Sequence, residues 1–269
     1  MRNLSPASSV IVGVDGSQPA TQAALWAVPE AVSRDIPLRL VHVVDAVDLA
    51  TPGAEGAHLA TARSALDGAQ RTVEAIGKPV KIETEILWGN PLTKLSEQSR
   101  SAAMICIGSM GIKHACYGEG SVARALPGVA RCPVAVVHRD MPWSPSPDTE
   151  TIVVEAENDR VLQYAFEEAR LRRAPLRAVA LWHAEVPEDL VGGNRLAQAQ
   201  LDRWITHLRR MYPDVVVDSA AFHGDLCTYL AELGESVQLV VTGVNGQRDL
   251  LGAPQRVECT VLTVHGSHL

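Results

Sequence analysis

Long apolar runs are missing from this chain of 269 residues. No segment approaches the roughly 20 consecutive apolar residues that a membrane-spanning helix requires. Residues 1–6 also lack the apolar core of a secretory signal peptide. These absences predict a cytoplasmic protein that does not enter a membrane.

Clustered positive charge is missing as well. The formal net charge is -7 and the isoelectric point is near 5.7, and Arg170, Arg172 and Arg173 stand beside Glu167 and Glu168. A general nucleic-acid-binding protein normally carries a basic stripe. We therefore expect no nucleic-acid partner.

Cysteine is scarce and is not arranged for metal binding. The five cysteines form no Cys-x-x-Cys pair and no Cys/His spacing typical of zinc. Cys106, Cys132 and Cys259 lie in or beside apolar sequence, which favours small buried core residues. Cys116 lies between two glycine turns, and a reactive or redox-sensing role stays open for it. We expect no resident metal.

Motifs of common enzyme classes are absent too. The chain has no Ser-His-Asp spacing, no paired carboxylates and no G-x4-G-K-[S/T] motif, and Gly13-x-x-Gly16 is not a dinucleotide fingerprint. His42 could serve as a general base, but its place in an apolar strand favours helix–sheet packing. We therefore expect a protein without a catalytic residue.

An internal repeat is the clearest feature that is present. Residues 10–15 align with 152–157, 37–39 with 175–177, and 132–134 with 259–261, while Gly89, Gly108 and Gly111 align with Gly224, Gly243 and Gly246. A chain of this length suits two domains. We predict a first domain over 1–138, a proline-rich linker over 139–150, and a second domain over 151–269.

Each copy alternates strands with helices. In the first, strands are expected at 10–14, 38–44, 80–87, 103–107 and 134–137, and helices at 19–33, 57–76 and 92–102 and from Ser121. This alternation predicts an α/β fold of two tandem doubly wound domains, each a mostly parallel sheet with helices on both faces. Ligands of such sheets bind at the carboxyl ends of strands, where Asp15 and Gly108 stand.

Two glycine turns follow the fourth strand. Gly108-Ser109-Met110-Gly111 comes directly after it, and Gly120-Ser121 opens a helix nearby. The glycines allow the backbone to approach a phosphate closely, and a helix N-terminus favours negative charge. Ser121 would add its hydroxyl, a role that is compatible with capping the helix. The pattern predicts a phosphate-binding loop.

These motifs, with Gly13-Val14-Asp15-Gly16-Ser17, His42-Val43 and Cys132-Pro133-Val134, resemble the universal stress protein family in its tandem-domain bacterial form. The resemblance covers 9–138 and, more weakly, 151–265. It implies five-stranded domains, like those of adenine nucleotide alpha hydrolases, and ATP as ligand, with or without Mg²⁺. The residues that it assigns to the nucleotide site are Gly13, Val14, Asp15, Val43, Gly108, Ser109, Gly111, Gly120, Ser121 and Val122.

Two of these residues would contact the nucleoside. By the resemblance, Asp15 would accept a hydrogen bond from the adenine amino group or a ribose hydroxyl, and Val43 would offer its backbone and an apolar edge to the base. Taken alone, Asp15 is equally suited to forming a turn before Gly16.

The first copy departs from the pattern G-x2-G-x9-G-[S/T] of the ATP-binding members. Eight residues, 112–119, separate Gly111 from Gly120. Met110 replaces a basic residue, and the loop carries Lys113 and His114, of which His114 is a candidate phosphate contact. Pro127 should bend the helix that follows.

The second copy departs further. Glu157 stands where the first copy has Asp15, and 12 residues, 247–258, precede Cys259, whereas 20 residues, 112–131, precede Cys132. We expect Gly243 to Gly246 to form the strand-end turn, and Gly252 to be a poor substitute for Gly-Ser at a helix start. This copy is expected to bind nucleotide weakly or not at all.

Three functions remain open from sequence. The first is a non-catalytic regulator whose ATP occupancy alters a surface for an unidentified protein partner. The others are a nucleotide-free dimerising scaffold and a slow ATPase. The last strands, 134–137 and 261–264, are expected to pair antiparallel within one chain and to leave helical faces for a homodimer.

Overall fold

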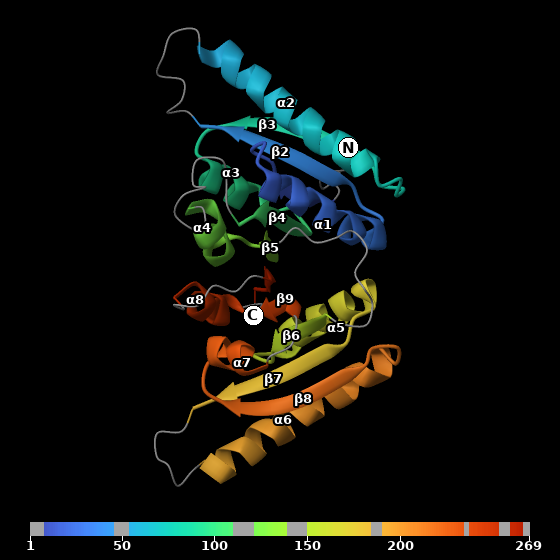
Figure 1. Ribbon diagram of the computed structural model, residues 1–269, viewed down its shortest axis with the longest axis vertical. Helices are drawn as coiled ribbons and strands as arrows, with labels where there is room; N and C mark the ends of the chain where they lie inside the picture. The colour runs from blue at the N-terminus through green and yellow to red at the C-terminus, as the bar shows by residue number, and fades with distance from the viewer. Residues whose placement is uncertain are drawn as a thin grey trace, which may run out of the picture. The chain divides into compact units, whose positions relative to one another are not determined.

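The computed structural model describes residues 8–45, 54–109, 121–138, 150–183, 190–233, 237–252 and 259–265. The chain divides into two compact units, Met1–Trp143 and Ser144–Leu269, at a point inside the predicted linker. Each unit is a five-stranded parallel sheet flanked by helices (Figure 1). The predicted fold class is confirmed.

The first unit has the strand order β3-β2-β1-β4-β5, and its strands pair in parallel. Its strands are β1 (Val10–Gly13), β2 (Leu38–Val44), β3 (Ile82–Trp88), β4 (Met104–Gly108) and β5 (Val134–Val137), and its helices are α1 (Gln18–Arg34), α2 (Ala54–Glu74), α3 (Pro91–Gln98) and α4 (Ser121–Val129). The expected elements differ from these by a few residues at their ends. Helix α4 continues past Pro127 and ends at Val129.

The second unit repeats this order as β8-β7-β6-β9-β10. Its strands are β6 (Thr151–Glu155), β7 (Leu176–Trp182), β8 (Val217–His223), β9 (Val237–Thr242) and β10 (Thr260–Thr263), and its helices are α5 (Asp159–Arg172), α6 (Leu190–Met211), α7 (Leu226–Leu233) and α8 (Val244–Gly252).

Both faces of the first sheet are covered. Ile11 belongs to a core cluster that takes in Leu95 of α3 and Leu126 of α4. Its strand neighbours Val10 and Val12 point to the opposite face, where α1 packs, and they are fully buried as well. This two-sided burial explains why β1, β4 and β5 are continuous apolar runs, whereas the edge strand β3 carries Glu83 and Glu85.

Helix α1 is fixed at both ends by local contacts. The Ser17 hydroxyl accepts the N–H of Ala20 at 3.2 Å, which caps the first turn, and Pro19 suits that turn because it needs no N–H partner. The helix ends at Asp35, which adopts the left-handed conformation with φ 51°. Alanines form part of the buried face of α1, where Ala24 and Ala27 are fully buried.

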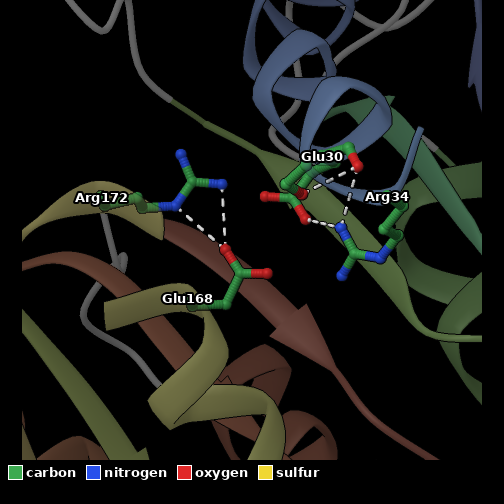
Figure 2. A network of polar contacts seen from close by, with 5 residues as sticks. Glu30, Arg34, Glu168 and Arg172 are labelled. Carbon is green, nitrogen blue, oxygen red and sulfur yellow. Dashed lines mark hydrogen bonds and ion pairs between the residues drawn. The ribbon is translucent and has the colours of Figure 1, made fainter. Parts of the chain in front are cut away.

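A buried glutamate on the first helix of each unit pairs with an arginine one turn later. The Arg34 guanidinium donates to Glu30 Oε2 at 2.5 Å, and Arg172 donates to Glu168 Oε2 at 3.0 Å (Figure 2). Both glutamates are fully buried. Because an uncompensated buried charge is strongly unfavourable, the ion pair with its arginine offsets part of the cost of burying each glutamate.

The end of the second unit differs from the sequence prediction. The segment Gly243 to Gly246 was expected to form a turn, but α8 begins at Val244, directly after β9. Gly252 is the last residue of that helix and does not begin one. The loop lost from this unit has therefore brought a helix N-terminus to the end of the strand.

Candidate functional site

The carboxyl ends of β1 and β4 form the natural site of the first unit. The chain runs from β1 outward to β2 and β3 on one side, whereas β4 and β5 lie on the other. Strands of a doubly wound sheet diverge at such a switch point and leave a crevice for a ligand. Asp15 follows β1 there, and Ser109 follows β4.

Asp15 is held by a tight turn. Its Oδ1 accepts the N–H of Ser17 at 2.9 Å, and Gly16 adopts a positive φ of 88°. The turn-forming role considered from the sequence is therefore present in the structure. The turn fixes the carboxylate at the end of β1. The predicted contact with the nucleoside requires it at the same position.

His42 lies beside this turn. Strand alternation puts it on the same face of β2 as Leu40 and Val44, which are buried, whereas His42 is only partly buried. Burial lowers its pKa, and the Val14 backbone and the charge of Asp15 oppose that shift. Its Nδ1 has no hydrogen-bond partner among the residues that the structure describes. The imidazole is therefore neutral near pH 7.

Two backbone donors of the predicted site are already used by the sheet. The N–H of Val14 donates to the Val41 carbonyl at 2.8 Å, and the N–H of Ser109 donates to the Val137 carbonyl at 2.9 Å. A phosphate at this edge would therefore have to draw its donors from 110–121. Of the predicted site residues, Gly111 and Gly120 lie outside the described residues, as do Met110, Lys113, His114 and Cys116.

Two glycines of the predicted site have packing reasons of their own. A Cβ at Gly108 would come within 2.5 Å of the Pro19 carbonyl carbon and 2.7 Å of the Ala20 nitrogen. A Cβ at Gly13 would approach Ile107 Cγ2 to 3.1 Å. Gly108 thus allows α1 to start against the end of β4, a reason that the sequence did not reveal.

Val43 and Val122 meet on one core. Both are partly buried and pack against the cluster that joins β1, β2 and β4 to α3 and α4. Helix α4 begins at Ser121, as predicted from Gly120-Ser121. The structure therefore brings the apolar members of the predicted site together, on the face that α3 and α4 cover.

The same edge of the second unit carries two glutamates. The Thr242 hydroxyl donates to Glu155 Oε2 at 2.5 Å, and the N–H of Gly243 donates to Glu157 Oε1 at 3.0 Å. Sequence comparison detected the change from Asp15 to Glu157. It did not detect these contacts, which join residues more than 80 positions apart.

The cysteines predicted to be structural are buried. Cys106, Cys132 and Cys259 all lie in the core. Burial raises the pKa of the Cys132 thiol to about 12, so this side chain stays protonated at neutral pH and is a poor nucleophile.

A groove of the first unit lies away from the strand ends. This groove of about 310 Å³ runs between α2 and the middle of β3 and is lined by Arg63, Leu66, Asp67, Thr84, Glu85 and Ile86. It is separate from the switch point and lacks its glycines.

Across the described ranges, no helix is long and apolar enough to cross a membrane.

The comparisons with known proteins agree with this architecture. The model of the universal stress protein family matches residues 7–138. A universal stress protein of Mycobacterium tuberculosis is 52% identical over 266 residues, which cover 98% of this chain and 98% of the relative. The chain belongs to the universal stress protein family. The match spans both units, so the tandem form predicted from the sequence is confirmed.

More distant universal stress proteins show the same arrangement. A second one of Mycobacterium tuberculosis is 42% identical over 283 residues and is matched over 97% of both chains. The crystal structure of a universal stress protein from Archaeoglobus fulgidus DSM 4304 has a TM-score of 0.70 at 15% identity and covers 97% of each chain. At 15% identity, this likeness shows the shared fold alone.

Proposed function

We propose that the first unit binds an adenine nucleotide, with ATP as the ligand, at the switch point between β1 and β4. The observation that carries this proposal is the turn of Asp15. It fixes a carboxylate at the end of β1, beside β4, which leads into the glycine turns predicted over 108–121. A fixed carboxylate can accept from an adenine amino group or a ribose hydroxyl without a further loss of conformational freedom.

The phosphates would lie over the segment that leaves β4. The N–H groups of Val14 and Ser109 donate within the sheet. We therefore assign the phosphate contacts to the N–H groups of Gly111, Gly120 and the start of α4. When bound, Mg²⁺ would neutralise part of the phosphate charge.

We further propose that the protein is a non-catalytic regulator of the cytoplasm. Occupancy of the first unit would change a surface that a protein partner, including a second copy of this chain, can bind. Such coupling requires only that ATP bind two states with different affinity, without hydrolysis. Neutral His42 lies beside Asp15, and among the described residues no group of three or more histidine, cysteine or acidic side chains is placed to hold a metal.

Mass spectrometry of the protein purified without added nucleotide, followed by calorimetric titration with ATP, tests this proposal. The Asp15→Asn variant keeps an oxygen for the Ser17 N–H but loses the charge, and it should weaken ATP binding by about tenfold. Asp67→Asn, an exposed position on α2, is the matched control and should change nothing. If no nucleotide copurifies and ATP gives no binding heat, the protein is a nucleotide-free scaffold.

A further inference from the structure

The two units place different side chains at equivalent strand ends. Val12 pairs with Cys106 in the first sheet, and Val154 pairs with Val241 in the second, so both copies share one register. The next residue after each first-strand valine is Gly13 in the first unit and Glu155 in the second. A glycine that leaves space has thus been replaced by a carboxylate.

The glutamates of the second unit point inward at this edge. Glu155 accepts from the Thr242 hydroxyl, which is fully buried, and Glu157 accepts from the N–H of Gly243, which is buried as well. A Cβ at Gly243 would overlap the Glu157 carboxylate, and one at Gly246 would overlap that of Glu155. The carboxylates therefore fill the space that these glycines leave open.

Helix α8 explains why carboxylates are stable there. It starts at Val244, so the N–H groups of Gly243 and of the first turn have no acceptor within the helix. Such a helix N-terminus favours an anion, and Glu157 supplies one by accepting from Gly243. In the first unit the corresponding helix begins only at Ser121, twelve residues after Ser109 in the chain.

We propose that the side chains of Glu155 and Glu157 occupy the second unit's strand-end site in place of a phosphate. They accept from the Thr242 hydroxyl and from the Gly243 N–H, the donors that lie where β9 meets α8, and their charge opposes that of a phosphate, so the second unit is complete without nucleotide. The inference rests on the proposed function, because it concerns the edge equivalent to the proposed nucleotide site. It gives the weak or absent nucleotide binding expected of the second unit a cause in these contacts as well as in the loss of loop residues.

Amide NMR of the full chain, titrated with inorganic pyrophosphate and with ATP, tests this proposal. In the unmodified protein the Gly243 amide should not shift with either anion. In a variant that combines Glu155→Gln and Glu157→Gln it should shift on addition of pyrophosphate, with an affinity at least roughly tenfold higher than in the unmodified protein. Glu232→Gln, an exposed position on α7, removes one charge from the same unit and should have no effect.

The single Glu157→Gln variant, which keeps an acceptor for the Gly243 N–H, provides the measurement if the double variant does not fold. A Gly243 amide that responds in the unmodified protein as strongly as in the variants overturns the proposal. So does a Gly243 amide that responds in no folded variant. The proposed function is judged separately, from the response of the Gly13 and Ser109 amides to ATP, which does not depend on either glutamate.

Discussion

The two units share a frame and differ at one edge. Their strand registers agree, Gly89 and Gly224 have φ of 133° and 135°, and each first helix carries the buried glutamate–arginine pair. At the strand ends, however, the first unit presents Asp15 beside a glycine, and the second presents two glutamates that bind its own backbone and hydroxyl groups. The features that both copies retain serve folding, and the strand ends are where the two copies differ in chemistry.

The glycines that both units retain show that one residue can serve two purposes. Gly108 in the first unit makes room for the backbone of Pro19 and Ala20, whereas Gly243 in the second makes room for the Glu157 carboxylate. A shared glycine therefore does not by itself indicate a shared ligand.

The strongest way to break the frame is at Gly108. Because a Cβ there would meet backbone atoms of Pro19 and Ala20, Gly108→Val should destabilise the first unit by about 3 kcal/mol or more. Urea denaturation measures this. At Gly68, in α2, an added Cβ meets nothing within 4 Å, and Gly68→Ala should stabilise by about 0.5–1 kcal/mol. Similar losses at both positions would contradict the packing argument.

The glutamate–arginine pairs compare the two units directly. Arg172→Met should cost about 3 kcal/mol, because it leaves the Glu168 charge without its helix partner. Arg34→Met should cost less, because the Arg34 side chain is 25% exposed and that of Arg172 only 11%. Lys81→Met breaks an exposed pair and should cost under about 1 kcal/mol. The comparison fails if the free energy of unfolding falls equally in all three variants.

Removal of the Glu157 carboxylate sharpens the difference between the strand ends. Glu157→Ala leaves the buried Gly243 N–H without its acceptor and should lower the free energy of unfolding by about 1–2 kcal/mol. Chemical denaturation followed by circular dichroism is the measurement. An unchanged midpoint would mean that the contact contributes nothing to α8.

The smallest expected effect is a pH dependence in the first unit. Burial lowers the pKa of His42 in the folded state below the ordinary histidine value of 6.5, so the unfolded chain binds more protons as the pH falls through that value. The contribution of neutral His42 is therefore complete above that pH and is lost as the pH falls. His42→Gln should flatten this part of the stability curve. An identical slope in the variant, measured by urea titration at several pH values, would assign the dependence to other groups.

The sequence revealed the frame better than the site. Strand and helix positions through Val44 followed from apolar periodicity, and the repeat fixed the register of the second unit, because these signals are local. The Gly243 to Gly246 segment was misread because its resemblance to Gly108 to Gly111 hid the effect of the lost loop, which moved α8 to the strand end. Intramolecular pairing of 134–137 with 261–264 stays a prediction.

The contacts of Glu155 and Glu157 could not have been predicted from spacing. They join β6 and the residues after it to the end of β9, and only the folded sheet brings these segments together. Asp15 shows the opposite case. Its turn with Ser17 is local, and it is the alternative that the sequence left open beside a nucleotide contact.

The carboxylate-filled edge of the second unit also affects how the protein responds to nucleotide concentration. A ligand that binds only the folded state stabilises it by about 2.7 kcal/mol at a concentration 100 times its Kd. Under the proposed function this gain reaches the first unit alone, because Glu157 already satisfies the Gly243 donor in the second. The stability of one half would then follow the energy state of the cell, while the other half provides a fixed reference within the same chain.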